Sequence, residues 1–330
     1  HDRSCYRLRM VESSGYPYTT LSHNVVVVDD SDQMFGGNMP RVPSLRFMVS
    51  SPRVSVVEAQ SRVYPRCSEY RRVVALLKGP DGETFAIDIF RVKGGSKHAY
   101  RVFSELASSD VKEGALEFIG LTMPPDGPLP NFGGITRREH VFGLRDIRTA
   151  DNPPAAWQAV WRQADRRYRL HLLMQADAVE ASNGPGQESH EQVGRRVRYL
   201  DVIRRGQDVA STFVAVHEPS GSNGTMPIMK AERLDVPQAA GANAVALRIE
   251  TKWNTYVVLN EFDEEASVAG VRFKGTFGVF AIAPDGRRWL LSCGATALES
   301  NGLGFRDAPD IWSGNPLVTR GIGGYLSWLD

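Results

Sequence analysis

Short apolar runs, many of them alternating with polar residues, recur along the chain between clusters of Gly, Pro, Asp and Ser. Period-two alternation is typical of a half-buried strand, and a short continuous apolar run is consistent with a strand buried on both faces. The pattern predicts more than a dozen strands, among them residues 24–29, 45–50, 53–60, 71–78, 84–92, 99–106, 168–175, 197–204, 210–217, 244–252, 256–261 and 271–283. Because strand and helix patterns do not alternate, we expect an all-β protein of antiparallel sheets stacked as a large β-sandwich.

Turn residues organise this pattern further. Pro-Asp-Gly follows an apolar run at Pro80 and again at Pro284, and each predicts a hairpin because Pro fixes φ and Gly supplies a positive φ. Residues 155–167 form the one helix candidate, with strand as the alternative for part of that length. Residues 123–134 and 182–194 are expected to be long surface loops. We expect one domain over residues 1–330, with a possible subdivision near 220–240.

Composition narrows the function classes. The 330 residues are 42% hydrophobic and 23% charged, which is ordinary for a folded protein. Lys+Arg total 39 and Asp+Glu 38, so no global field favours nucleic acid or an anionic membrane. No stretch approaches the roughly 18 apolar residues of a membrane span, and the three cysteines have no zinc-site spacing. The chain begins with His1 and has no signal-peptide pattern, so we expect a piece of a longer polypeptide.

A histidine at the start of a valine run is the first candidate for chemistry. His23 precedes Asn24 and a strand that looks buried on both faces, where an imidazole could bind a metal or exchange a proton. From the residues alone, a histidine that satisfies a loop carbonyl is the favoured interpretation. Asp29, Asp30 and Asp32 could serve as metal ligands, but aspartates after a strand are typical of a solvated turn, which we favour.

Other polar groups lie on predicted strands. His98 and Tyr100 follow a Gly-Gly reversal and share one face of a strand, so they could act as acid and base or hold a sugar, or simply be half-buried aromatics. Arg71 belongs to a group of arginines whose guanidinium groups suit acidic sugars, although alternating arginines are usually a strand's solvent face. His217 alternates with apolar residues and is interpreted as a core-facing histidine or one satisfied by a partner within the protein. The six tryptophans could stack on sugars, but packing in the sandwich is the commoner role.

Four stretches, in order, resemble one known family. SHNVVVVDDSDQ (22–33) is similar to the HNTVVVDG-x-x-Q segment of the heparinase II/III-like polysaccharide lyases, with Val25 in place of Thr and Asp30 in place of Gly. The other stretches are YRRVVALLKGPDGETFAIDIFRVKGGSKHAY (70–100), NGPGQ (183–187) and RYLDVIRRGQDVASTFVAVHEP (198–219). The resemblance covers most of residues 16–219.

The resemblance implies that this chain is the C-terminal β-sandwich of such a lyase, which in the family packs against an N-terminal α/α toroid. It implies β-elimination on a uronate-containing polysaccharide of glycosaminoglycan or alginate type, and a secreted or periplasmic location. A non-catalytic carbohydrate-binding or structural module is the alternative.

The resemblance also implies roles for individual residues. It makes His23 a ligand of a divalent metal, usually zinc in the family, with the other ligands expected upstream of His1. The residues expected to reach the substrate are, for catalysis, His98, Tyr16 and Tyr18, and for substrate binding, Asn24, Arg71 and Tyr100. After HAY (98–100) the family often continues into a second histidine, whereas this chain reads RVFSEL.

Overall fold

The computed structural model describes residues 19–34, 43–80, 82–104, 115–124, 144–163, 166–186, 196–220, 224–306 and 324–329. Within these ranges the chain is almost entirely strand and turn, with two 3-10 helices of three residues each, Thr20–Ser22 and Gln238–Ala240. No helix in the described ranges has the length and apolar character that a membrane span requires. The expected all-β fold is confirmed.

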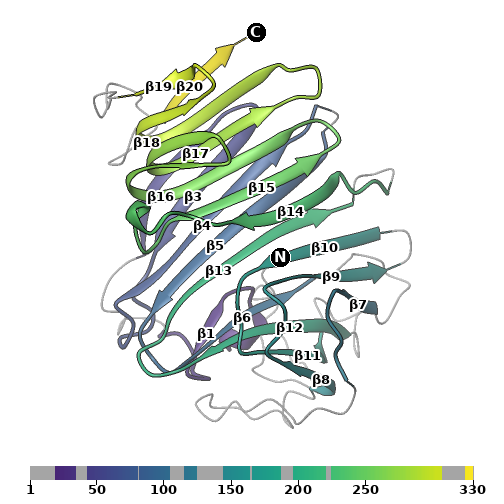
Figure 1. Cartoon of the computed structure of the whole chain (residues 1–330). Helices are drawn as coiled ribbons and strands as arrows, with labels where there is room; N and C mark the ends of the chain where they lie inside the picture. Colours follow the sequence, from purple (N-terminus) through teal and green to yellow (C-terminus); the bar gives the residue numbers. More distant parts are fainter. Residues whose placement is uncertain are drawn as a thin grey trace. The chain divides into compact units, whose positions relative to one another are not determined.

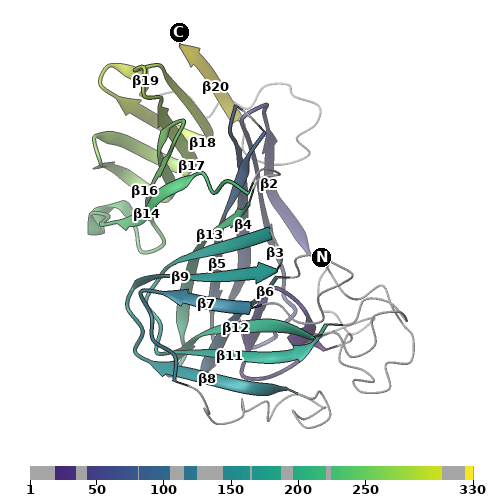
Figure 2. The same cartoon turned by 90° about the vertical axis from the view of Figure 1, so that its right-hand side faces the viewer.

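Three sheets organise the strands, which are labelled in Figures 1 and 2. The five-stranded sheet has the order β1 (Val26–Val28), β6 (Lys97–Phe103), β12 (Arg196–Arg205), β11 (Ala178–Pro185) and β8 (Arg145–Asp151). The eight-stranded sheet has the order β2 (Ser44–Ser50), β3 (Val54–Gln60), β4 (Glu69–Lys78), β5 (Thr84–Lys93), β13 (Ala210–Pro219), β10 (Arg166–Leu173), β9 (Ala156–Gln163) and β7 (Ala115–Ile119). The seven-stranded sheet has the order β14 (Ile228–Leu234), β15 (Val245–Thr251), β16 (Thr255–Val268), β17 (Val271–Ile282), β18 (Arg288–Ser300) and β19 (Leu303–Phe305), and β20 (Gly324–Leu329) also pairs with β18. The strand pairs β1–β6, β11–β12, β9–β10, β15–β16 and β16–β17 are antiparallel, as expected.

The chain divides into two compact units. Unit 1 comprises residues 1–44, 60–72 and 88–224, and unit 2 comprises residues 45–59, 73–87 and 225–330. The last boundary lies between Gly224 and Thr225. Two earlier hairpin segments also belong to unit 2, which a linear division of the chain does not anticipate.

The core of unit 1 lies between two layers. Val26 and Leu200 come from the five-stranded sheet, Trp161, Leu170 and Phe213 come from the eight-stranded sheet, and all five belong to one buried cluster. The opposite face of the five-stranded sheet carries a second buried cluster, which includes Val27 and Tyr199. The valines of β1 are therefore buried on both faces, as the unbroken apolar run predicts.

The helix expected over residues 155–167 is wrong, and the strand alternative is correct. Trp157, Ala159 and Trp161 all point into the core of unit 1 with period two. Strand β9 pairs with β10 on one side and with β7 on the other. This two-sided pairing, which local periodicity cannot register, overrides the helix-like composition of the segment.

The loop expected over residues 182–194 is wrong at its start, because Ser182 to Pro185 belong to β11 and pair with β12. Gly184 serves packing here. A Cβ atom at this position would lie 2.7 Å from the side chains of Leu144 and Tyr199, so this strand position accepts only glycine without a shift of its neighbours.

Unit 2 has its own aromatic contacts. Phe262 and Phe273 meet edge to face at 5.3 Å between ring centroids. Phe85, from the β4–β5 hairpin, meets Tyr256 at 5.5 Å. The β4–β5 hairpin therefore contacts β16, which lies far along the chain.

Candidate functional site

A row of polar side chains crosses four neighbouring strands of the eight-stranded sheet inside unit 1. Arg72 comes from β4, Asp88 from β5, His217 from β13 and Tyr168 from β10, and Tyr100 reaches them from β6 in the facing sheet. We call these five residues the inter-sheet cluster. The β4–β5 hairpin brings Arg72 and Asp88 together although they are 16 residues apart.

Arg72 and Asp88 form a bidentate pair. Arg72 Nε donates to Asp88 Oδ1 at 2.8 Å and Arg72 Nη2 donates to Oδ2 at 2.7 Å. Burial alone would raise the pKa of Asp88, but the charge of Arg72 and the hydrogen bond with His217 hold that pKa well below its usual value. Asp88 is therefore an ionised carboxylate in the interior of the sandwich.

The hydrogen bonds around His217 define its tautomer. Tyr100 OH donates to Asp88 Oδ2 at 2.6 Å, so its oxygen is left to accept from His217 Nε2 at 3.2 Å. With the proton on Nε2, Nδ1 accepts from the hydroxyl of Tyr168. This assignment follows from the hydrogen-bond network. The order Tyr168, His217, Asp88 is that of a hydroxyl, its base, and a carboxylate that orients the base.

The surroundings of Tyr168 and His217 determine which of the two holds the phenolic proton. Burial, followed by the charge of Asp88, raises the pKa of Tyr168, so its phenol is protonated near neutral pH. His217 keeps 19% of its side chain exposed, whereas Asp88 keeps 1%. The arrangement can therefore take the proton of Tyr168 onto His217 and return it, at a position near the edge of the sandwich interior.

Two predicted substrate-binding residues lie at this cluster. Tyr100 is a member, and Asn24 contacts it through its main chain, since Arg72 Nη1 donates to the Asn24 carbonyl at 2.9 Å. The side chain of Asn24 is engaged elsewhere, because its Oδ1 accepts from Phe103 N at 2.8 Å and its Nδ2 donates to Phe103 O at 3.2 Å. The amide of Asn24 thus holds the segment before β1 against β6.

His98 lies on β6 but outside the cluster. The residue is fully buried, with Nε2 at 2.7 Å from Gly94 O and Nδ1 at 2.8 Å from Ser211 Oγ. Burial lowers its pKa. Because both ring nitrogens are engaged within the protein, this environment favours a structural role for His98 over contact with a substrate.

A predicted substrate-binding residue on β4 is also separate from the cluster. Arg71 pairs with Glu69, and since neighbouring strand residues point to opposite faces, it lies across the sheet from Arg72. Tyr16 and Tyr18 lie outside the described residues.

His23 follows the 3-10 helix Thr20–Ser22, and its backbone N–H donates to Thr20 O at 3.2 Å. Its side chain is partly exposed. In the described part of the chain, no group of three or more His, Cys, Asp or Glu side chains is arranged to hold a metal ion. The role of His23 as a metal ligand stays a prediction, because its expected partners lie upstream of His1.

The aspartates after β1 form the turn that the sequence favoured. Asp29 and Asp30 have φ angles of 51° and 50°, in the left-handed region. Asp29 Oδ1 accepts from the backbone N–H groups of Ser96 and Lys97 at 2.7 and 2.9 Å, and Oδ2 accepts from Arg66 at 2.7 Å. Burial opposes ionisation, yet these donors lower the pKa of Asp29 to about 2. The turn is thereby tied to the start of β6.

Sequence reasoning missed Asp88 and Tyr168, and it interpreted His217 as core-facing or satisfied by a partner, without identifying that partner. One local signal was present, since Asp88 interrupts the apolar stretch FAIDIF, where an unpaired carboxylate would be costly. The position of Tyr168 gave no such signal, because its hydroxyl meets His217 only through the pairing of β10 with β13.

Comparisons with known proteins found similarity among solved structures. No protein-family model matches the chain, and no curated protein matches it. Among solved structures, it is similar to the heparan sulfate lyase HepC from Pedobacter heparinus, with 10% identity and a TM-score of 0.46 over 77% of this chain and 32% of that one. It is also similar to heparinase III, with 11% identity and a TM-score of 0.44 over 74% of this chain and 30% of that one. The chain therefore spans about a third of the length of these solved structures.

Proposed function

We propose that this chain is the β-sandwich part of a polysaccharide lyase that cleaves a uronate-containing polysaccharide by β-elimination, together with an N-terminal α/α toroid. The four ordered stretches that resemble the heparinase II/III-like lyases support this proposal. The observation that carries it is the hydrogen bond from Tyr168 to His217, with Asp88 behind the imidazole.

β-Elimination needs a base for the C5 proton of the uronate and an acid for the leaving glycosidic oxygen. In our proposal, His217 Nδ1 takes the phenolic proton as the oxygen of Tyr168 takes the C5 proton. The C5–H electrons form the C4–C5 double bond, the C4–O bond breaks, and the proton held on His217 returns through Tyr168 to the leaving oxygen. Asp88 stabilises the imidazolium that forms in between.

The uronate carboxylate must also be neutralised. Arg72 is committed to Asp88 and to the carbonyl of Asn24, so we do not assign it this task. A divalent metal bound by His23 and by ligands upstream would supply the positive charge, and we propose zinc as the metal. Because the described residues do not complete such a site, no proton transfer is assigned to it.

The test is an assay for ultraviolet-absorbing unsaturated uronates, using the full polypeptide on heparan sulfate, chondroitin sulfate, hyaluronan and alginate. Tyr168→Phe keeps the ring and removes the hydroxyl, so we expect kcat to fall about 10²- to 10⁴-fold. Tyr199→Phe is the matched control, since it also loses one buried hydroxyl, which donates to Pro185 O at 2.8 Å, away from the cluster.

Equal activity of the Tyr168→Phe variant and the wild type would contradict the assignment of the base. No unsaturated product from the full polypeptide on any of the four polymers would overturn the lyase proposal and favour the carbohydrate-binding module.

Metal content tests the role of His23 separately. We expect His23→Ala to lower the zinc bound per chain of purified full polypeptide, because one ligand is lost. Elemental analysis with His98→Ala as the control measures this. The assignment fails if the His23→Ala protein carries as much zinc as the wild type.

A further inference from the structure

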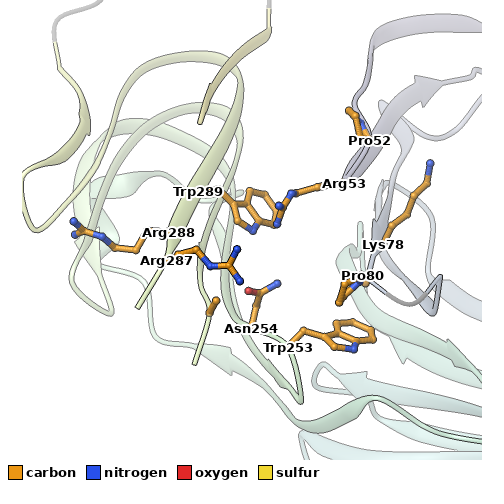
Figure 3. A pocket seen from close by; sticks show the side chains of 11 residues that line it. Pro52, Arg53, Lys78, Pro80, Trp253, Asn254, Arg287, Arg288 and Trp289 are labelled. Atoms are coloured by element: carbon orange, nitrogen blue, oxygen red, sulfur yellow. The ribbon is translucent and has the colours of Figure 1, made fainter. Parts of the chain in front are cut away.

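Unit 2 contains a pocket of about 370 Å³, a size typical of small-ligand sites. Figure 3 shows its walls: the turn between β2 and β3 with Arg53, the end of β4 with Lys78, the β15–β16 turn with Trp253 and Asn254, and the start of β18 with Trp289. All of these residues belong to unit 2, and none belongs to the inter-sheet cluster.

The lining of the pocket is strongly cationic. Four of its eleven described residues carry a positive charge and none carries a negative one; the four are Arg53, Lys78, Arg287 and Arg288. Arg287 has an ion pair with Asp285 at 2.7 Å, but both side chains are more than half exposed. The whole chain has a formal net charge of only +1, so this concentration is local. A concave surface of one charge sign attracts ligands of the opposite sign.

The pocket also offers neutral donors. Trp289 and Trp253 are 6% and 8% exposed, and the Nε1 atom of each is buried with no acceptor among the described residues. A buried donor without an acceptor has lost its hydrogen bonds to water without replacement, and a ligand oxygen would restore one. In Figure 3 the ring nitrogen of Trp289 lies on the side of Arg287 and Asn254.

A cation already lies near each of the two indole rings. The Arg53 guanidinium lies 5.7 Å from the Trp289 ring centroid, and Lys252 Nζ lies 5.9 Å from that of Trp253. Gly79 packs so closely that a Cβ atom there would lie 2.5 Å from the Trp253 ring. Single-stranded nucleic acids need an open aromatic platform on which their bases can stack. A saccharide carries its anionic groups beside hydroxyls and needs no such platform.

We propose that this pocket binds one acidic sugar unit of a polysaccharide, through its sulfate or carboxylate group, without taking part in catalysis. Arg288, Lys78 and Arg287 supply the charge, and the indole N–H of Trp289 donates to an anion oxygen. The binding is argued from the lining of unit 2 and does not rest on the lyase proposal.

The test is calorimetric titration of the full chain with a heparin tetrasaccharide, with inorganic sulfate and with oligo(dT). The variant Lys78→Gln/Arg287→Gln/Arg288→Gln removes three lining charges and leaves Arg53 on Trp289. Its matched control, Arg272→Gln/Lys274→Gln/Arg306→Gln, removes three charges of unit 2 that do not line the pocket. We expect the pocket variant to raise the Kd for the tetrasaccharide at least about tenfold, and the control to change it less than about twofold.

Trp289→Phe keeps the ring and removes the N–H, and we expect it to raise the same Kd roughly three- to tenfold. Equal Kd values for the pocket variant and its control would overturn the proposal. Inorganic sulfate that binds as tightly as the tetrasaccharide would overturn the saccharide as ligand, as would oligo(dT) bound equally well and lost in the pocket variant. The pocket is tested by the Kd for the tetrasaccharide and the lyase proposal by the unsaturated product of Tyr168→Phe, so failure of the pocket and failure of the lyase proposal give different results.

Discussion

The two polar sites use similar residues in opposite ways. In the inter-sheet cluster of unit 1, Arg72 is neutralised by Asp88 and each ring nitrogen of His217 has a tyrosine hydroxyl beside it. In the pocket of unit 2, no lining residue is a carboxylate, Arg287 pairs with Asp285 outside the lining, and the indole N–H groups lack acceptors among the described residues. Groups that are hydrogen-bonded to one another within the protein can hold and transfer a proton. Buried donors without an acceptor in the protein can instead bind an acceptor from a ligand.

The largest effect expected from this difference is on stability. Asp88→Asn leaves the charge of Arg72 without its partner in the sandwich interior, so we expect the free energy of unfolding to fall by about 3 kcal/mol. Asp285→Asn breaks the exposed pair with Arg287, and we expect no measurable change. Chemical denaturation of the two variants and the wild type measures both. Similar midpoints for the two variants would mean that the inter-sheet cluster contributes no more than a surface ion pair.

A smaller effect concerns pH. All seven histidines fall in the residue ranges of unit 1. Burial lowers the pKa of His98 and of His171, so below neutral pH these two imidazoles bind protons more readily in the unfolded chain than in the folded one. Their stabilisation is full above a pH of about 6.5, the pKa of an unfolded histidine, and is lost as the pH falls below it.

Unit 1 should therefore open more readily at pH 5 than at pH 7.5, whereas unit 2 should change little. Hydrogen exchange read by mass spectrometry, corrected for the intrinsic effect of pH, compares peptides of the two units. Equal loss of protection in both units would rule out histidine burial as the cause, and His98→Gln should remove part of the difference.

Local patterns predicted the strands well where alternation was undisturbed. They failed for β9, where the tryptophans fit either period, and for the start of β11, where Gly184 and Pro185 suggested a loop. In both segments the pairing with neighbouring strands determines the structure, and this pairing depends on residues outside the segment, so the local sequence does not predict it.

The site was predictable in part for the same reason. Tyr100 was found because it follows a recognisable reversal, but its partner His217 is 117 residues away. The resemblance and the shared strand face with Tyr100 make His98 a catalytic candidate, but the turn also brings the carbonyl of Gly94 to 2.7 Å from its ring, a contact that the strand pattern does not show. A sequence shows which groups are available, and the order of strands in the sheets decides which of them meet.

Unit 2 is assembled from pieces of chain made at very different times. Lys252 Nζ donates a hydrogen bond at 2.7 Å to Glu83, which lies 169 residues earlier in the chain, and the ring of Phe85 contacts that of Tyr256. During synthesis the early hairpins leave the ribosome long before the strands that they contact, so unit 2 folds late. Its folding also costs the entropy of closing a long loop. A chain truncated after Gly224 would not be unit 1 alone, because it would still contain residues 45–59 and 73–87. The apolar side chains of these two hairpin segments would lack their partners from the rest of unit 2.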